Sequence, residues 1–240
     1  MKYIPLILLS FTALSGSAFA GFDSCTNTTA SEKFCTCQLS ALHPTQKVVG
    51  MIEVGRKERE ILTKNLNKPK RSQSFWDKNA IPTVIGPNGV LYPIDHHHLS
   101  LALLKANITD GVCKVVSNFS DLTSEDFWGM MKSKNWVYLF DENGKPIEVS
   151  HLPEKMMDLV DDSYRSLAGI VRKKGGIEKV DQPYAEFLLA NFLRTRITLS
   201  YVGNNFDPLV IEQAIALALS PEASSLPGHI SERKSIVENN

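Results

Sequence analysis

Two features that would assign a broad class at once are missing from this sequence: a second long hydrophobic run and an excess of charge of one sign. Beyond residue 20, no segment is apolar over the roughly 20 residues that a membrane-spanning helix needs. Lysine and arginine together number 26, as do aspartate and glutamate, so the formal net charge is zero. The composition as a whole therefore indicates neither a nucleic-acid-binding protein nor a disordered chain.

The hydrophobic run that is present lies at the N-terminus. Lys2 is followed by an apolar stretch from Ile4 to Leu14 and then by Ala18-Phe19-Ala20. A positive start, a short apolar stretch and an Ala-x-Ala ending predict a secretory signal peptide over residues 1–20. An uncleaved membrane anchor is the alternative, although the stretch is short for one. We therefore expect a mature chain that starts at Gly21, has no transmembrane segment and is exported to the periplasm or secreted.

Cysteine is scarce, and all four residues follow the expected cleavage site: Cys25, Cys35, Cys37 and Cys113. An even number in an exported protein predicts two disulfides. Because a Cys35–Cys37 bridge would close a very tight ring, we expect one of these two to pair with Cys25 and the other with Cys113. A metal site at Cys35 and Cys37 is disfavoured, because the spacing is Cys-x-Cys and a second cysteine pair is missing.

Hydrophobic periodicity and turn residues predict short strands alternating with helices. Residues 21–40 are polar and are expected to form an irregular arm. The expected strands are 81–86 and 90–94, joined as a hairpin by an Asn-Gly turn, then 113–116 and 136–140. The expected helices are a segment from 44 to about 62, then 95–104 with Asp95 as its cap, 124–133, 161–174, 183–197 and 208–219.

A basic segment interrupts this pattern at residues 64–74. It holds Lys64, Lys68, Lys70 and Arg71 and has no apolar periodicity, so we expect a loop. Such a run is usually only a solvated surface, and a contact with phosphate is the alternative interpretation.

Several segments, in order, resemble the putative ParB-like nuclease family of the ParB/sulfiredoxin superfamily. The resemblance covers roughly residues 40–200. It is carried by His43-Pro44-Thr45-Gln46 with Val49-Gly50, Ile85-Gly86-Pro87-Asn88-Gly89, Tyr92, Ile94-Asp95-His96-His97-His98-Leu99, Asp161-Asp162-Ser163-Tyr164-Arg165-Ser166-Leu167-Ala168, Glu186-Phe187-Leu188 and Phe192-Leu193-Arg194.

The resemblance implies an α+β fold: a small mixed sheet with helices, of the ParB/sulfiredoxin type, plus a C-terminal helical extension. We expect a Cys-rich N-terminal arm over 21–40, a ParB/sulfiredoxin-like core over 41–145, a helical extension packed on that core over 146–220, and a flexible tail over 221–240.

The superfamily holds nucleotide phosphate with a segment like Asp-Gly-x-x-Arg-x-x-Ala, and this chain departs from that segment. Asp95 and Ala102 match, but His96 stands at the glycine position and Leu99 at the arginine position. Leucine offers no charge-assisted clamp, and glycine would let backbone approach phosphate closely. The loop has no cysteine for sulfiredoxin-like chemistry, and Thr45-Gln46 stands where related serine kinases use a glutamate. These departures argue against a nucleotide-driven clamp or kinase.

Asp95-His96-His97-His98 nevertheless remains the best candidate site. A helix N-terminus favours an anion, and imidazoles can act as general acid and base or ligate a metal with a carboxylate. The first hypothesis is therefore an exported nuclease-like phosphodiesterase, in which His97 or His98 acts as base or acid, His96 belongs to the same catalytic run, and Arg165 clamps the phosphate. Asp95 would orient a histidine or hold a divalent metal, the one cofactor considered. Further binding candidates are Gln46, Lys47, Tyr164 and Glu186.

The second hypothesis is a non-catalytic binding module. On this interpretation the fold holds nucleic acid or another phosphate-bearing or anionic ligand, and the C-terminal helices dock a protein partner of unknown identity. A structural role is also open for two of the features: Asp95 as a helix cap, and Arg165 as the ion-pair partner of a buried Glu186.

Overall fold

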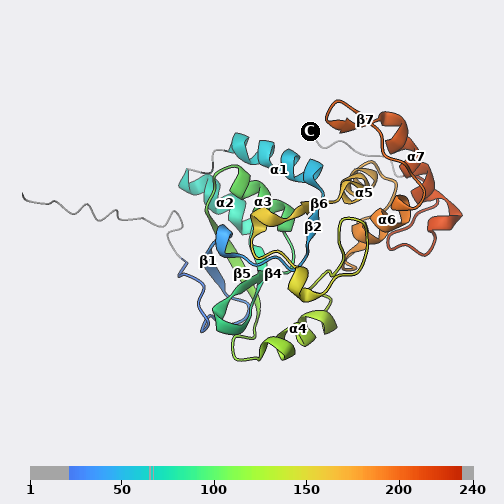
Figure 1. Ribbon diagram of the computed structural model, residues 1–240. Helices are drawn as coiled ribbons and strands as arrows, with labels where there is room; N and C mark the ends of the chain where they lie inside the picture. Colours follow the sequence, from blue (N-terminus) through green and yellow to red (C-terminus); the bar gives the residue numbers. More distant parts are fainter. Residues whose placement is uncertain (1–21, 65, 67, 234–240) are drawn as a thin grey trace, which may run out of the picture.

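The computed structural model describes residues 22–64, 66 and 68–233, and Figure 1 shows a sheet with surrounding helices beside a group of C-terminal helices. The expected signal peptide, residues 1–20, lies outside this range. Among the described helices, none is both long enough and apolar enough to cross a membrane.

A four-stranded mixed sheet forms the centre of the N-terminal part. Its order is β1 (Phe34–Gln38), β5 (Asp110–Asn118), β3 (Ile81–Ile85) and β4 (Leu91–Pro93). β3 runs parallel to β5, while β1 with β5 and β3 with β4 are antiparallel. The predicted α+β class with a small mixed sheet is confirmed.

The predicted hairpin leads directly to the candidate site. β3 and β4 are joined by a 3-10 turn, Pro87–Gly89, in which Asn88 (φ 59°) and Gly89 (φ 76°) both have left-handed backbone. Asparagine and glycine are the residues that adopt this conformation most readily. The hairpin therefore forms as predicted, and β4 ends two residues before Asp95.

Residues 34–38 correct the expectation of an irregular arm. They form β1, in which Cys35 and Cys37 are buried while Phe34 and Gln38 are exposed. The small and polar side chains of this strand gave little hydrophobic signal, and its partner β5 lies far along the chain. The disulfides join Cys25 to Cys35 and Cys37 to Cys113. The expectation that Cys35 and Cys37 pair separately, with these two partners, is confirmed.

Helices cover both faces of the sheet. α1 (Met51–Lys64), α2 (Pro69–Asn79) and α3 (His97–Lys105) share one core with inward residues such as Ile81, Leu103 and Val115. Val84 points to the opposite face, because side chains alternate along a strand, and packs with Phe127 of α4 (Ser124–Ser133).

α2 corrects the expectation of a loop over residues 64–74. Pro69 occupies the first turn of the helix, a position where a proline is well tolerated. Ser72, Phe75 and Trp76 are buried at helical spacing, so the segment does have a packed face. The four cations of residues 64–74 made this apolar spacing hard to recognise in the sequence.

The C-terminal helices form a second core. α5 (Ser163–Lys173), α6 (Ala185–Arg194) and α7 (Pro208–Leu219) bury residues such as Leu167, Leu189 and Ile215 against one another. A short hairpin, β7 (Tyr201–Val202) with β8 (Asn205–Phe206), precedes α7.

Part of the expected tail is held in place, since Gly228 O accepts from Glu178 N and Arg233 donates to Lys174 O. Further 3-10 turns are Leu39–Ala41, Val149–His151, Met156–Asp158 and Pro221–Ala223.

Two short strands and one glycine connect the sheet side of the molecule to the C-terminal helices. β2 (Val48–Val49) pairs in parallel with β6 (Val160–Asp161). A Cβ atom on Gly50 would lie 2.7 Å from Ser166 Oγ and 2.9 Å from the Ser166 backbone nitrogen. Glycine at this position therefore allows α1 and α5 to start in close contact, and α1 links the sheet to the C-terminal helices.

The predicted strand over residues 136–140 is wrong. Tyr138 forms an isolated bridge with Gln46, and Phe140 forms another with Pro146. Of the aromatic residues that suggested a strand, Tyr138 and Phe140 pack with Phe187 in a small separate cluster, and Trp136 packs on the cluster around Phe127.

Candidate functional site

A cleft of about 540 Å³ opens where α1, α3, α5 and α6 meet. Its lining is polar and comes from four stretches of chain far apart in the sequence. They are Glu53 and Lys57 of α1, residues 94–99 at the start of α3, Arg165 and Arg172 of α5, and residues 179–187 leading into α6, joined by Gln46, Asn135 and Trp136. The Asp95–His98 run, Arg165 and Glu186 are thus brought together.

The residues at the start of α3 line this cleft. His96 precedes the helix with left-handed backbone (φ 64°, ψ 20°), and its N–H donates to Asp95 Oδ1 over 2.6 Å. Asp95 therefore holds the turn before the helix and is not the N-cap that the sequence suggested. The N–H groups of His97, His98 and Leu99 have no intrahelical acceptor, and the described residues supply no other.

His97 is a buried structural residue. The Thr45 N–H donates to His97 Nε2 over 3.2 Å, and the Thr45 hydroxyl lies 3.3 Å from the same nitrogen while donating to Pro93 O. Nε2 must therefore be the unprotonated nitrogen. Burial lowers the pKa of His97 to about 4, so the ring is neutral near pH 7. We therefore assign His97 to holding the 43–47 segment against β4.

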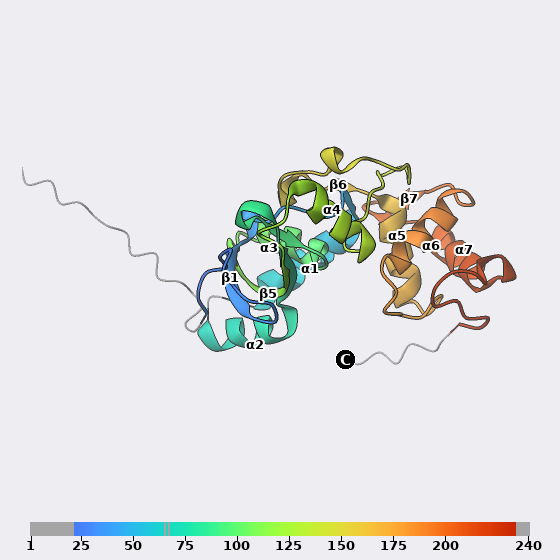
Figure 2. The ribbon, with the colours of Figure 1, turned by 90° about the horizontal axis from the view of Figure 1, so that it is seen from below.

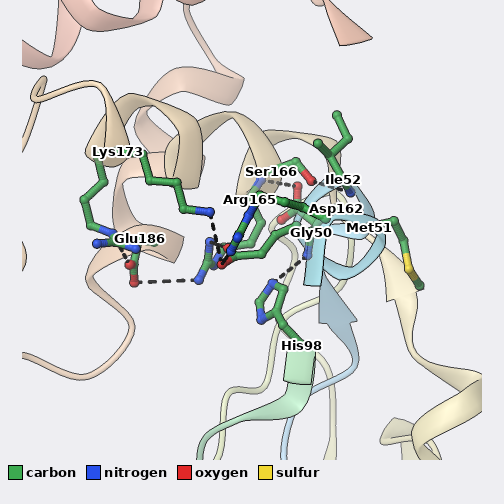
Figure 3. Close-up of polar contacts among 12 residues, drawn as sticks. Gly50, Met51, Ile52, His98, Asp162, Arg165, Ser166, Lys173 and Glu186 are labelled. Carbon is green, nitrogen blue, oxygen red and sulfur yellow. Dashed lines mark hydrogen bonds and ion pairs between the residues drawn. The ribbon is translucent and has the colours of Figure 1, made fainter. Parts of the chain in front are cut away.

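His98 occupies the junction of two helix starts. The Gly50 N–H, just before α1, donates to His98 Nε2 over 3.0 Å, as Figure 3 shows. The proton of the neutral ring must then be on Nδ1. Burial, and next the charge of Arg165, lowers the pKa of His98 well below 6.5. His98 is therefore a neutral hydrogen-bond donor in the cleft, and its lone pair is already used.

Arg165 is a buried cation whose hydrogen bonds are incomplete. The residue is 8% exposed, and its Nε and Nη1 atoms have no hydrogen-bond acceptor within the described ranges. Its closest carboxylates are those of Glu186, at 3.7 Å from Nη2, and Glu53, at 4.0 Å from Nη1. The guanidinium also lies 5.2 Å from the centre of the Phe187 ring. Its charge is balanced by these carboxylates, while Nε and Nη1 keep no acceptor among the described residues.

Two carboxylates accompany this arginine. Burial alone would raise the pKa of Glu53, but nearby cations, Lys173 and Arg165 among them, hold it at about 2, so Glu53 is ionised. Glu186 pairs with Arg172, with 2.8 Å between Oε1 and Nε. Figure 3 shows Lys173, Arg165 and Glu186 converging from α5 and α6. The expected pairing of Arg165 with Glu186 is present, but Glu186 has its shorter ion pair with Arg172.

The remaining candidates divide between the cleft and other places. Gln46 lines the cleft, although its amide donates to Val48 O over 2.6 Å. Lys47 instead pairs with Glu142 at 3.1 Å, outside the cleft lining. Tyr164 points into the C-terminal helices, where its hydroxyl donates to Ile197 O and Arg194 lies over its ring.

Sequence reasoning missed Glu53, Lys57, Arg172 and Tyr184. Glu53 and Lys57 are four residues apart on one helix, which is a spacing that signals only an exposed ion pair. Among the residues that the structure describes, no three His, Cys, Asp or Glu side chains gather closely enough to hold a metal ion.

Comparisons with known proteins agree with this fold. A family model described as "Putative ParB-like nuclease" matches residues 35–195. The crystal structure of protein Atu1540 from Agrobacterium tumefaciens is similar, with 36% sequence identity and a TM-score of 0.72. That similarity covers 82% of this chain and 97% of the other. No protein with a curated description matches.

Proposed function

The chain belongs to the family described as Putative ParB-like nuclease, and on that premise we propose that its cleft binds a phosphate-bearing ligand. The phosphate would lie between the start of α3 and Arg165. The observation that carries this proposal is the state of Arg165, a buried guanidinium with two nitrogens that lack acceptors. Buried polar groups are nearly always hydrogen-bonded, and an unsatisfied one indicates a missing partner.

The surrounding donors suit an oxyanion. The N–H groups of His97, His98 and Leu99 lie at the positive end of the α3 dipole, where anions bind without a dedicated side chain. The neutral His98 ring adds its Nδ1–H, and Arg165 adds the charge that Leu99 cannot supply. This arrangement uses the histidine run for hydrogen bonding and does not require proton transfer.

Phosphodiester hydrolysis is the second candidate, and the family description favours it. In that case His96 would transfer protons beside Asp95, because His97 and His98 already accept from Thr45 and Gly50. Burial lowers the pKa of His96, so its neutral ring would act as the base. A divalent metal is the cofactor to test in this candidate.

The deciding experiment measures binding and cleavage together. The purified protein is incubated with nucleic acid, with chelator or with Mg²⁺, Mn²⁺ or Zn²⁺, and examined on a gel. Retention without product supports binding, and product formation supports hydrolysis. Chelator sensitivity of the product would assign a metal to the reaction.

Arg165→Gln tests the site itself. We expect the affinity for inorganic phosphate to fall about tenfold or more, because a charged hydrogen bond contributes about 1.5–3 kcal/mol. Arg196→Gln is the matched control, since Arg196 is exposed and pairs with Glu222 away from the cleft. Unchanged phosphate affinity in a folded Arg165→Gln protein would refute the proposal.

A further inference from the structure

One segment of the chain carries positive charges only, and the proposed cleft does not account for them. Between Glu60 and Asp77 there is no acidic residue, but there are four cations: Lys64, Lys68, Lys70 and Arg71. This local excess occurs in a chain whose formal net charge is zero. We call these four residues the cationic track.

The cationic track is exposed and is not neutralised within the fold. All four side chains lie at the surface, at the end of α1 and the beginning of α2. None of them forms an ion pair with any carboxylate among the described residues. Many other cations of the chain are paired, for example Lys47, Arg172 and Arg194. The packed face of α2 consists of Ser72, Phe75 and Trp76, so the cations contribute nothing to the core.

The cationic track continues from the cleft. Lys57 lines the cleft, and Lys64 lies seven residues later on α1, hence on the same side of the helix and about 10.5 Å further along its axis. α2 begins five residues after α1 ends and carries Lys70 and Arg71. Figures 1 and 2 both place α2 on the side of the molecule away from α5 and α6, so this line of charge leads outward from the site.

We propose that the cationic track is a second contact surface for a nucleic-acid strand whose phosphate occupies the cleft. The proposal rests on the function proposed above and extends it, because it makes the ligand a polymer. A line of cations fits a strand better than a flat membrane. Leu62 is the exposed large apolar side chain next to the track, and one such side chain gives a membrane little to bind.

The test compares ligands of different length. A single-stranded dinucleotide, an 8-mer and a 16-mer are titrated against the protein at several salt concentrations. The track variant carries Lys64→Gln, Lys68→Gln, Lys70→Gln and Arg71→Gln. Its matched control carries Lys105→Gln, Lys132→Gln, Lys145→Gln and Lys155→Gln, four exposed lysines elsewhere that change the net charge equally.

We expect the 16-mer to bind the unmodified protein about tenfold or more tightly than the dinucleotide. The track variant should lose this gain, keep its dinucleotide affinity and show a salt slope shallower by about 3, from about 0.7 per phosphate contact. The control variant should behave as the unmodified protein does.

Three results would overturn the proposal. The first is equal affinity for the dinucleotide and the 16-mer, and the second is an equal loss in the control variant. The third is a track variant that binds the 16-mer normally but no longer sediments with vesicles of anionic lipid, which would assign the surface to membranes. A 16-mer that depends on the cationic track but not on Arg165 would support the track and refute the cleft as the phosphate site.

Discussion

His97 and His98 each accept a backbone N–H, from Thr45 and Gly50, and burial lowers the pKa of both rings. The pKa of His97 is about 4 in the folded protein, against an ordinary value of 6.5. Below pH 6.5 His97 is protonated in the unfolded chain, but in the folded chain it stays neutral until about pH 4. Stability is therefore complete above pH 6.5 and falls as the pH drops toward 4.

We predict that the free energy of unfolding decreases between pH 6.5 and 4.5, with His97 contributing up to about 1.4 kcal/mol per pH unit. Urea denaturation at a series of pH values measures this slope. Glu53 affects stability only below its ordinary value of 4.5, because its pKa is lowered to about 2, so Glu53 does not contribute between pH 4.5 and 6.5. His97→Asn should flatten the slope, while His151→Asn, at an exposed position, should not. A flat profile in the unmodified protein would contradict the assignment.

The turn from β6 into α5 organises several elements at once. Asp161 accepts the Met51 N–H, and Ser166 Oγ accepts the Ile52 N–H, so the first turn of α1 is capped from this segment. Asp162, only 2% exposed, accepts the Arg165 N–H over 3.1 Å and forms a 2.7 Å ion pair with Arg194 of α6. The position of Arg165 in the cleft therefore depends on Asp162.

Asp162→Ala should destabilise the protein by about 3 kcal/mol, because it removes a helix cap and leaves the partly buried Arg194 without its carboxylate. Chemical denaturation measures the change. Asp162→Asn keeps a good cap but loses the ion pair, so its loss should be smaller, and phosphate binding should weaken less than in Asp162→Ala. Equal effects of the two substitutions would show that the cap at Arg165 is unimportant.

Elements with strong local signals were predicted well from sequence. α7 was predicted at its observed bounds, and α5 within two residues, because caps and periodicity agree there. β1 was missed because its partner β5 lies far away and its small side chains resemble a loop. The strand predicted at 136–140 failed because neighbouring chain supplies only isolated bridges, including one to a proline, which has no N–H to donate.

At the scale of the whole molecule, the two disulfides close loops of very different length. Cys37 and Cys113 are 76 residues apart in sequence, and Cys25 and Cys35 are 10 apart. A cross-link restricts the unfolded chain more when its loop is longer. Both bridges belong to the sheet side of the molecule, and the C-terminal helices contain none.

We predict that Cys37→Ser/Cys113→Ser lowers stability more than Cys25→Ser/Cys35→Ser does. The chain-entropy relation gives about 4.5 and about 2.7 kcal/mol respectively. Thermal or urea unfolding of both double variants, under oxidising conditions, measures the difference. The reverse order would mean that native packing around the bridges outweighs loop entropy.

The sequence identified several residues of the cleft lining but missed others. The Asp95–His98 run and Arg165 were selected because their residue types are chemically distinctive. Glu53, Lys57, Arg172 and Tyr184 reach the same space only through the packing of α1 against α5 and of α6 against α5. Such long-range contacts leave no trace in local spacing, so Glu186 was the one partner of Arg165 expected from sequence, and Glu53 was found only in three dimensions.

The left-handed backbone of His96 has a consequence for engineering. The loop keeps the shape that a glycine would give it, so His96→Gly should be accepted without rebuilding the turn and should relieve about 1 kcal/mol of strain. Position 99 behaves differently, because Leu99 is 5% exposed and an arginine there would have to enter the core. A designer who wished to install a nucleotide clamp could therefore reverse one departure with a single substitution, but the other is locked by the packing of α3.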